Sequence, residues 1–314
     1  MTPDKDPERP RIAVYGAGAL GAYFGGKLAQ AGVDVHLIAR GAQLDALRAG
    51  PLRVRSTQGD FETSIAATSE TKSVGPCDAV ILCVKAYHVN EIAPTLAPLM
   101  GEDTAVVPVQ NGVAHLEPLC DAVGAEHVLG GAAFVFATVT EPGLVVHSAG
   151  PGSIVFGELD GRLSERAQRL DATLSNAGIE TELVENIRER MWAKFAYICA
   201  HAGMTAAGRS PIGAIRASQP AWEMFRQLLD EIIELAQAEG VELAAGVADR
   251  LIEFANSLAP DSTSSMYNDL VSGRQTELEA LHGFAVERAH RHGLSLPANE
   301  AVYALLAAQT TAPG

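Results

Sequence analysis

The chain has 314 residues, 47% of them hydrophobic and 19% charged, which is an ordinary balance for a globular protein and enough chain for two domains. Its 23 Lys and Arg residues against 38 Asp and Glu give a formal net charge of −15, which argues against binding of nucleic acid or of an anionic membrane. The four cysteines are widely spaced and form no C-x-x-C pair, so we expect reduced thiols and neither a disulfide framework nor a zinc site.

No targeting or membrane segment is evident in the sequence. Residues 1–10 are polar and proline-rich and lack the apolar region of a secretory signal. No apolar run reaches the ~20 residues that a membrane-spanning helix needs. We therefore expect a cytoplasmic protein.

A glycine-rich segment follows the first apolar run. Residues 12–15 predict a buried strand, and a helix-compatible run continues to residue 31. Between them lies the pattern G-x-G-x-x-G, made of Gly16, Ala17, Gly18, Ala19, Leu20 and Gly21. In a dinucleotide-binding fold the three glycines permit the tight turn, the approach of a pyrophosphate to the backbone and close helix packing, and the helix N-terminus faces the phosphates. A glycine turn can be merely structural, but the flanking strand and helix favour nucleotide binding.

The end of the second predicted strand, residues 34–40, indicates which dinucleotide binds. NAD-preferring folds usually place an Asp or Glu there for the ribose 2′-hydroxyl. This chain places Arg40 there, and a guanidinium would attract a 2′-phosphate through charge-assisted hydrogen bonds. An arginine at a strand end can be merely solvated, but combined with the glycine pattern it favours NADP(H).

Two further buried strands end in polar residues. Residues 78–85 end in Lys85, and residues 104–109 lead into Gln110, Asn111 and Gly112. Ligands gather at the carboxyl ends of strands in an open α/β sheet, so we expect Lys85 to point toward a cofactor crevice. An Asn-Gly pair is usually just a turn, so the residues alone leave Asn111 open between a turn residue and a ligand contact.

The rest of the first half continues the alternation of strands and helices. We predict strands at 52–55, 61–66, 128–139, 144–147, 154–156 and 181–184, and helices at 42–49 and 163–177. The first two strands would pair at the margin of the sheet, and residues 149–152 would form a hairpin turn. The pattern predicts an α/β, Rossmann-type dinucleotide-binding domain over residues 1–185.

Strand-like runs disappear after residue 185, so residues 186–314 predict an all-helical second domain. Helices are expected from about 187, and at 220–239, 244–258, 264–272, 276–292 and 298–308. Asn186 and Glu189 have the spacing of a capping box at the first helix, and Ser218 is expected to cap the second. The fold expected is therefore Rossmann-type followed by helices.

Most charged residues of the second half have no spacing that indicates chemistry. The acids Asp230, Glu231 and Glu234 fit the solvent face of an amphipathic helix. The histidines His282, His290 and His292 lack a metal-ligand spacing, and we expect surface or helix-capping positions for them.

Lys194 and Glu277 remain as candidates for chemistry. Lys194 lies in a mostly apolar helical run, and Glu277 lies at the start of a predicted helix. A snorkelling lysine and a first-turn acid are the plainest interpretation, and periodicity alone does not overturn it.

At these residues the chain resembles the ketopantoate reductase (2-dehydropantoate 2-reductase) family, from about residue 11 to residue 309. The likeness rests on the glycine pattern, on Arg40, and on Val84-Lys85-Ala86, Asn111-Gly112, Met191-Trp-Ala-Lys194, Ser264-Ser-Met266 and Thr276-Glu277 with His282-Gly-Phe284. The order and spacing of these segments make the resemblance far more specific than the glycine pattern alone.

The resemblance implies an NADPH-dependent reductase of pantothenate biosynthesis, with its site between two domains, that reduces the C2 carbonyl of a 2-keto acid. Ketopantoate would be the leading substrate and pantoate the product. Lys194 matches the catalytic lysine, whose ammonium polarises the carbonyl and protonates the forming alkoxide. Glu277 matches an acid that borders cofactor and substrate, and Asn111 a residue where the nicotinamide meets the substrate. Ser265 matches a substrate contact, and Lys85 and Arg40 match cofactor contacts.

The chain departs from the family pattern in its expected substrate pocket. Members that act on ketopantoate commonly carry an Asn at the positions of Ile198, Ala202 and Ile212. Amides bind hydroxyl groups, whereas Ile and Ala offer apolar surface, and loss of such partners changes selectivity by orders of magnitude. The resemblance therefore implies that the reduction of a 2-keto acid is retained, but it leaves the exact 2-keto acid open. The alternative to ketopantoate is a 2-keto acid with a more apolar tail.

Two other functions fit part of the sequence pattern. A 3-hydroxy acid dehydrogenase with a helical second domain would also use a lysine, but Arg40 and the Ser-Ser-Met and Thr-Glu segments favour the reductase. A non-catalytic NADP(H)-binding sensor would have no need of both Lys194 and Glu277. The partner expected is a small 2-keto acid, without nucleic acid, membrane or metal. Long amphipathic helices in the second domain are compatible with a homodimer.

Overall fold

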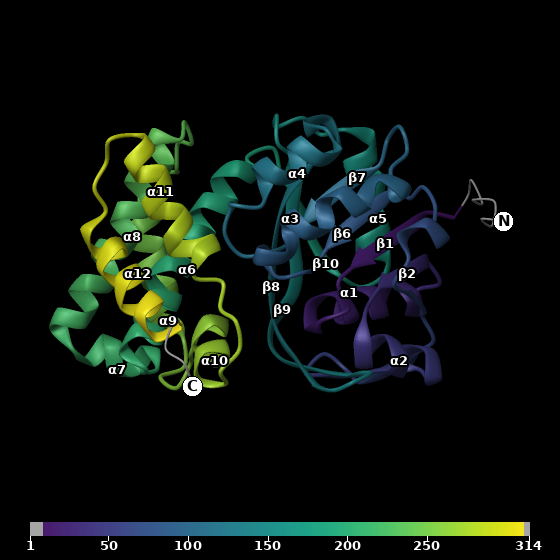
Figure 1. Cartoon of the computed structure of the whole chain (residues 1–314), viewed down its shortest axis with the longest axis horizontal. Helices are drawn as coiled ribbons and strands as arrows, with labels where there is room; N and C mark the ends of the chain where they lie inside the picture. The colour runs from purple at the N-terminus through teal and green to yellow at the C-terminus, as the bar shows by residue number, and fades with distance from the viewer. Residues whose placement is uncertain (1–8, 311–314) are drawn as a thin grey trace. The chain divides into compact units, whose positions relative to one another are not determined.

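A computed structural model describes residues 9–310 of the chain (Figure 1). The polar segment at residues 1–10, on which the expectation of no secretory signal rests, lies outside this range except for its last two residues. Contacts divide the chain into two compact units: Met1–Gln110 with His115–Ile187, and Asn111–Ala114 with Arg188–Gly314. Residues 111–114, which the sequence placed in the first domain, thus pack with the second unit. No helix among the described residues is long and apolar enough to cross a membrane.

The first unit contains a parallel sheet of five strands, in the order β5-β2-β1-β6-β7. Its strands are β1 (Arg11–Tyr15), β2 (Asp34–Ile38), β5 (Ala66–Thr68), β6 (Ala79–Leu82) and β7 (Ala105–Pro108). Numbered among themselves in chain order, they run 3-2-1-4-5, which is the beginning of the Rossmann order. The strands β6 and β7 are buried throughout, as expected for short apolar runs covered on both faces.

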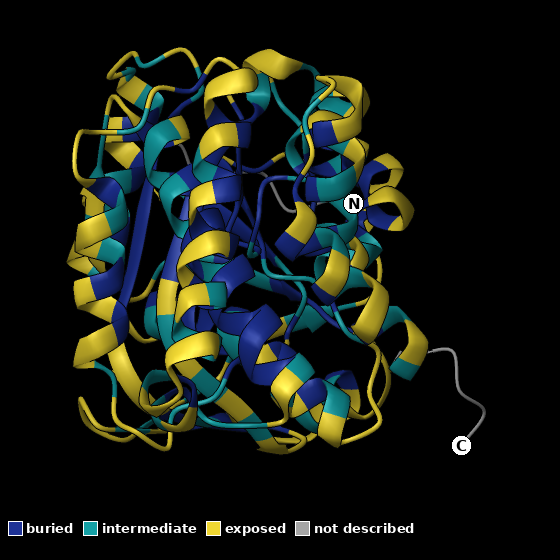
Figure 2. Ribbon diagram, turned by 90° about the vertical axis from the view of Figure 1, so that its left-hand side faces the viewer, coloured by how far each residue is buried: buried dark blue, intermediate teal, exposed yellow. Residues whose placement is uncertain are grey.

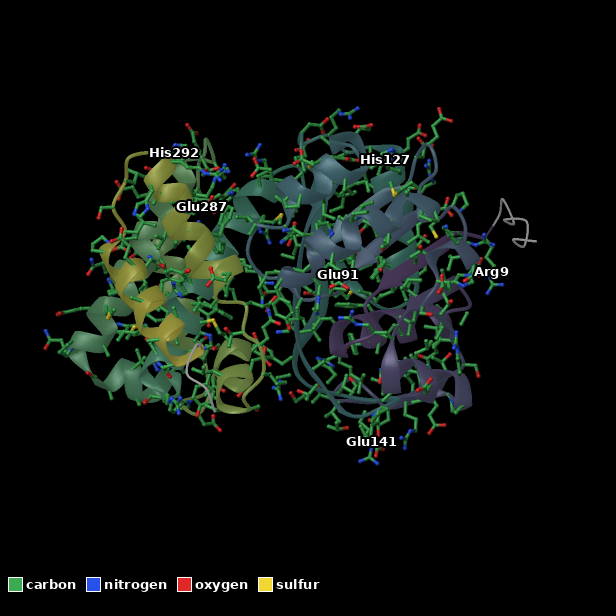
Figure 3. All side chains as sticks on the ribbon, viewed as in Figure 1. Arg9, Glu91, His127, Glu141, Glu287 and His292 are labelled. Atoms are coloured by element: carbon green, nitrogen blue, oxygen red, sulfur yellow. The ribbon has the colours of Figure 1, made fainter. Side chains whose placement is uncertain are left out.

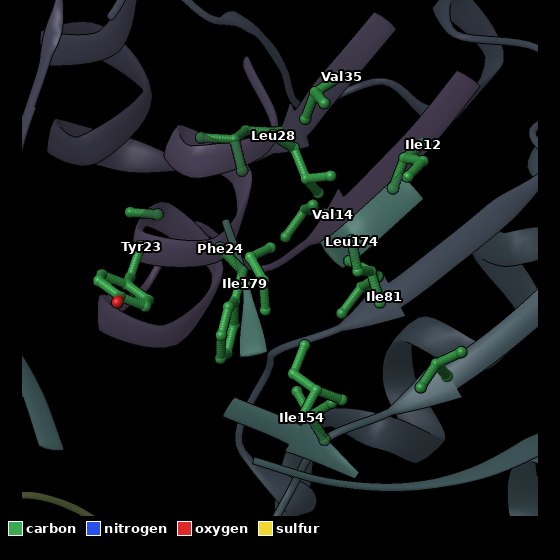
Figure 4. Close-up of a cluster of buried hydrophobic side chains, with 14 of the residues drawn as sticks. Ile12, Val14, Tyr23, Phe24, Leu28, Val35, Ile81, Ile154, Leu174 and Ile179 are labelled. Atoms are coloured by element: carbon green, nitrogen blue, oxygen red, sulfur yellow. The ribbon is translucent and has the colours of Figure 1, made fainter. Parts of the chain in front are cut away.

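Successive residues of β1 point into two different apolar clusters. Ile12 and Val14 pack in a cluster that includes Phe24 of α1, and Ala13 packs in another with Val80. This alternation follows from the two-residue period of a strand. Figure 4 shows the first cluster, where side chains from β1, α1 and the second sheet meet.

The helices of the first unit connect these strands. They are α1 (Ala19–Gln30), α2 (Gly41–Ala49), α3 (Val89–Ile92), α4 (Leu116–Val123) and α5 (Glu165–Asn176), with short 3-10 turns η1 (Thr71–Ser73), η2 (Ala86–His88), η3 (Ala93–Leu99) and η4 (Ala125–His127). The predictions of helices at 42–49 and 163–177 are confirmed to within two residues.

A second sheet in this unit overturns two predictions. It consists of β3 (Leu52–Ser56), β4 (Phe61–Thr63), β8 (Leu129–Glu141), β9 (Leu144–Glu158) and β10 (Glu180–Leu183). The pair β3–β4 forms as predicted but does not lie at the margin of the first sheet, because β3 pairs in parallel with β9. The predicted hairpin turn at 149–152 is wrong, since these residues lie within the single strand β9.

Two glycines within β9 account for the irregular pairing at residues 149–152. Gly150 and Gly152 have positive φ angles of 86° and 65°, and the pairing with β8 shifts register around Phe136. The extra residues of β9 are thus absorbed as an irregularity in a continuous ladder. The reversal itself lies at residues 142–143, between β8 and β9.

The second unit is all-helical, as predicted. It contains α6 (Ile187–Gly208), α7 (Ile212–Ala217), α8 (Gln219–Ala238), α9 (Val247–Ser257), α10 (Ser265–Val271), η5 (Glu279–Gly283), α11 (Phe284–Arg291) and α12 (Pro297–Thr310). Figure 2 shows how buried and exposed residues alternate along the helices, as in amphipathic helices. The expected fold, Rossmann-type and then helical, is confirmed.

Local predictions in this unit need three corrections. Ser218 occupies the N-cap of α8, but its side chain makes no capping hydrogen bond. The predicted helix 276–292 instead begins with the π-helical turn η5, and only then continues as α11. Glu231 and His282 are not surface groups, because they are 7% and 0% exposed.

Candidate functional site

The glycine pattern forms a tight turn between β1 and α1. Gly16 has φ +98°, a conformation that favours glycine, and its N–H donates to the carbonyl of Ile38 at 3.0 Å. A Cβ on Gly21 would lie 1.9 Å from the carbonyl oxygen of Gly16, so only glycine lets α1 start this close to the turn. The tight turn and close helix packing expected of the first and third glycines are therefore present.

Gly18 differs from its neighbours because it borders open space. It is the N-cap of α1, has φ −68°, and a Cβ placed on it would meet nothing within 4 Å. No side chain caps this helix end, and its first turn holds no acidic residue. The N–H groups and the positive dipole end of a twelve-residue helix thus fit a phosphate group, and a dinucleotide suits this cradle.

Arg40 and Lys85 follow strands of the same sheet. Arg40 comes after β2 as the N-cap of α2, and its side chain is 70% exposed. Its guanidinium lies 3.5 Å from Glu91, which Figure 3 labels, and 3.2 Å from Nε2 of His88. An ion pair this exposed contributes about 0–1 kcal/mol, so an incoming phosphate could displace it. Lys85 follows β6, is half-buried, and is the N-cap of η2.

Asn111 lies in the loop after β7 that packs with the second unit. The next residue, Gly112, has φ +81°, and a Cβ on it would lie 3.2 Å from Cδ2 of Leu281 and 3.7 Å from Cδ2 of Phe195. Leu281 belongs to η5, and Phe195 follows Lys194 on α6. The loop that carries Asn111 therefore packs on α6, which carries Lys194, and on η5, which follows Glu277.

Lys194 and Glu277 interact within the second unit. Burial of the Lys194 ammonium lowers its pKa to about 8, and the charge of Glu277 opposes this shift. Glu277 is 6% exposed and lies just before η5. A buried carboxylate that interacts electrostatically with an amine whose pKa is moved toward neutrality is typical of a proton-transfer site.

The face of α6 beyond Lys194 is largely apolar but includes buried polar side chains, His201 among them. Ile198 and Ala202 lie one and two turns further along, half-buried and buried. His201, also about two turns from Lys194, is 5% exposed and stacks on Tyr197 at 5.4 Å between ring centroids. Burial lowers the pKa of His201 to about 4, so the ring is neutral at pH 7. Seven residues are close to two helical turns, so His201 lies on nearly the same face of α6 as Lys194.

The Ser-Ser-Met segment lies at the start of α10. Ser264 is the N-cap and is buried, accepting hydrogen bonds from the N–H of Tyr267 at 3.0 Å and from the hydroxyl of Thr205 on α6 at 2.8 Å. Ser265, the residue expected at the substrate, is exposed. The Thr205–Ser264 bond ties this segment to the same helix as Lys194. Ile212, the third position that departs from the family pattern, is fully buried at the start of α7.

The structure describes two other groups from the sequence analysis. All four cysteines are free thiols, as expected. Among residues 9–310, no cluster of three or more His, Cys, Asp or Glu side chains could hold a metal ion.

Comparison with known proteins gives the family. Two family models match in succession: "Ketopantoate reductase PanE/ApbA" over residues 12–161, and "Ketopantoate reductase PanE/ApbA C terminal" over residues 186–310. The chain is 34% identical to a 2-dehydropantoate 2-reductase of Archaeoglobus fulgidus over 297 residues, covering 94% of this chain and 96% of that protein.

Solved structures are similar over nearly the whole chain. A PanE/ApbA family ketopantoate reductase from Ralstonia eutropha JMP134 superposes with a TM-score of 0.88 at 30% identity, covering 96% of this chain and 98% of that one. A D-mandelate dehydrogenase, solved with NADH and anilino(oxo)acetate, shares the fold with a TM-score of 0.87 at 23% identity, over 96% of this chain and 98% of that one. This chain belongs to the ketopantoate reductase family and is an oxidoreductase with a nicotinamide dinucleotide as its cofactor.

Proposed function

We propose that the protein uses NADPH to reduce the C2 carbonyl of a 2-keto acid, with Lys194 as the proton donor. Ketopantoate is the leading substrate, because the relative from Archaeoglobus fulgidus is a 2-dehydropantoate 2-reductase. The proposal gives the first unit the role of an NADP-binding domain and the second unit that of the catalytic domain.

The pairing of Lys194 with Glu277 carries this proposal. A lysine with a pKa of about 8 is mostly protonated at pH 7 yet gives up its proton more readily than an ordinary lysine. Its ammonium would stabilise negative charge on the carbonyl oxygen and then protonate the alkoxide. The charge of the buried Glu277 favours the ammonium form of the lysine, and would so help the amine to regain a proton from solvent after each turnover.

The cofactor contacts are assigned from the cradle in the first unit. Gly18 and the N-terminus of α1 would hold the pyrophosphate, with the other residues of the pattern, Gly16, Ala17, Ala19, Leu20 and Gly21, shaping the turn. Arg40 would bind the 2′-phosphate, and Lys85, Asn111 and Glu277 would make further contacts. When bound, the cofactor supplies the hydride to the carbonyl carbon.

A 2-keto acid with a tail more apolar than that of ketopantoate is the alternative substrate. Ile198 and Ala202 offer no hydrogen bond, whereas family members that act on ketopantoate commonly have Asn at both positions. A site without these amides has little means to select a hydroxylated substrate. Asn111, Lys194 and Ser265 would bind the polar head that all 2-keto acids share.

A panel of 2-keto acids tests the function. Pairs of acids matched in size, one with and one without a hydroxyl on the tail, are compared by the loss of NADPH absorbance. We expect efficient turnover of at least one acid and a preference for the apolar member of each pair. A wide margin in favour of ketopantoate would refute the interpretation of Ile198 and Ala202. Binding of NADPH without turnover of any acid would instead favour the sensor.

A further inference from the structure

The turn that follows Glu277 has an unusual hydrogen-bond pattern. The carbonyl of Glu277 accepts the N–H of Leu281 at 3.1 Å, and the carbonyl of Leu278 accepts the N–H of Gly283, five residues on, also at 3.1 Å. These bonds open the π-helical turn Glu279–Gly283. A π turn holds an extra residue, and here both Leu281 and His282 are buried, at 2% and 0% exposure.

Leu281 supports the loop of Asn111. A Cβ on Gly112 would lie 3.2 Å from Cδ2 of Leu281 and 3.3 Å from the carbonyl oxygen of Ala280, so the loop lies directly on the π turn. Gly112 has φ +81°, a backbone conformation that glycine adopts readily, so the loop keeps this shape without strain. Any movement of the turn would therefore move the loop as well.

His282 ties the same turn to α12 and α8. Its Nδ1 lies 3.0 Å from Oδ1 of Asn299, whose amide nitrogen donates to Glu231 at 2.8 Å and to the carbonyl of Leu228 at 3.2 Å. With the amide nitrogen committed to these two acceptors, Oδ1 must accept from His282, so Nδ1 carries the proton. Burial lowers the pKa of His282 to about 4, which keeps the ring neutral and the chain of bonds intact at pH 7.

The other edge of the His282 ring lies against α6. A Cβ on Gly203 would be 2.7 Å from Nε2 of His282 and 3.0 Å from Cγ1 of Val302 on α12. Only a glycine lets α6 approach the imidazole this closely. Since α6 carries Lys194 nine residues earlier, the ring separates the helix of the lysine from the turn of the glutamate.

We propose that His282 is a positioning residue. It sets the distance between the π turn that follows Glu277 and the helix that carries Lys194. Through Leu281 it also sets the position of the loop that carries Asn111. The proposal rests on the proposed function for its catalytic meaning. His282 belongs to η5 and acts through that turn. Its neutral ring is a rigid spacer, hydrogen-bonded to Asn299 on one edge and close to Gly203 of α6 on the other.

Gly203→Ala tests the proposal without changing His282. The added methyl would force the ring away from α6, while alanine favours a helix more than glycine does, so a loss of activity would not come from a weaker helix. Gly208→Ala is the matched control, because a Cβ there meets nothing within 4 Å on the same helix. We expect Gly203→Ala to lower kcat roughly ten- to hundred-fold, with little change in NADPH affinity, because small misplacements of catalytic groups are costly. Gly208→Ala should match the wild type in both.

A titration of Lys194 separates positioning from mere folding, and does not require turnover. The pH dependence of its acetylation rate, followed by mass spectrometry of the full-length protein, reports its pKa. A shift in Gly203→Ala with no shift in Gly208→Ala supports the proposal, since the charge of Glu277 is one of the two causes of the pKa. An unchanged titration and unchanged kcat, with only a lower melting temperature, would overturn it.

His282→Ala provides the second arm in case Gly203→Ala does not fold. Removing the ring makes room for the added methyl, so the double variant should lose little beyond His282→Ala alone, whereas independent effects would add. His282→Gln, which keeps an amide within reach of Asn299, should recover part of the lost kcat. Additive effects and no recovery would overturn the proposal. Absence of wild-type turnover would defeat the proposed reductase activity but leave the Lys194 titration informative.

Discussion

The carboxylate of Glu231 on α8 caps the N-terminus of α12 through Asn299. It accepts the backbone N–H of Asn299 at 3.0 Å and its side-chain amide at 2.8 Å, and also the N–H of Ala298 at 2.9 Å. A negative charge at a helix N-terminus is stabilising, and here it comes from another helix rather than from the preceding residue. Two helices far apart in the sequence are thereby locked in register.

Glu231→Ala should therefore destabilise the second unit. It leaves several buried donors without their acceptor, at a cost of about 2–4 kcal/mol. Glu234→Ala, an exposed acid one turn further along the same helix, should stay within about 0.5 kcal/mol of the wild type. Urea unfolding of both variants measures the difference, and equal stabilities would show that the cap contributes nothing.

Substitutions at Gly18 and Gly21 should have different effects, on NADPH binding and on stability respectively. Gly18→Ala places its methyl in open space at an ordinary φ of −68°, so the fold should persist while NADPH binding weakens at least ten-fold, because the methyl takes the place of the pyrophosphate. Gly21→Ala would force a methyl to 1.9 Å from the Gly16 carbonyl, so it should lower the melting temperature. Unimpaired NADPH binding by Gly18→Ala would refute the cradle.

Arg40 should decide between the two nicotinamide cofactors. Arg40→Ala removes a charge-assisted hydrogen bond worth about 1.5–3 kcal/mol, so the Kd for NADPH should rise about ten- to hundred-fold while that for NADH stays constant. Arg162→Ala removes another exposed arginine of the first unit and serves as the control. Calorimetric titration gives the four constants, and an equal loss for both cofactors would exclude a 2′-phosphate contact.

The turnover should depend on the protonation of Lys194. With a pKa of about 8, the lysine loses its proton as the pH rises through 8, so kcat should fall on the alkaline side of that value. Lys194→Ala should lose about 10²- to 10⁴-fold in kcat and keep its affinity for NADPH. A flat profile up to pH 10, or a fully active variant, would end the assignment of Lys194 as general acid.

The same pKa predicts a pH dependence of stability. The folded state loses the Lys194 proton near pH 8, whereas the unfolded chain keeps it up to the ordinary value of 10.5, so the unfolded state binds more protons in this window. The free energy of unfolding of the wild type should therefore rise, relative to Lys194→Met, between pH 8 and 10.5. Lys72→Met, at an exposed lysine, should show no such difference.

Local features of the sequence determined the first βα unit and most helices. The apolar run of β1, the turn at Gly16 and the helix of α1 depend on neighbours within a few residues, so the sequence was enough to predict them. The family resemblance likewise rested on short motifs, and the family models bear it out. The roles of individual site residues, including Lys194 and Arg40, remain predictions.

The tertiary structure decided features that depend on partners far along the chain. The strand β3 leaves the first sheet because β9, about ninety residues later, offers it a parallel partner. Glu231 has the helical spacing of a solvent-facing acid, and only the arrival of α12 turns it into a buried cap. His282 became buried because Gly203 leaves space for it and Asn299 binds it.

The pKa of Lys194 is also decided by the tertiary structure. A lysine in an apolar helical run reads equally well as a snorkelling surface group, because periodicity carries no information on how much water reaches the amine. In the folded second unit, burial lowers the pKa of the amine and the charge of Glu277 partly opposes this, so that the pKa is about 8. Sequence alone determined which groups are present and in what local structure, whereas tertiary packing decided their solvation and their neighbours, because both depend on residues far away in the chain.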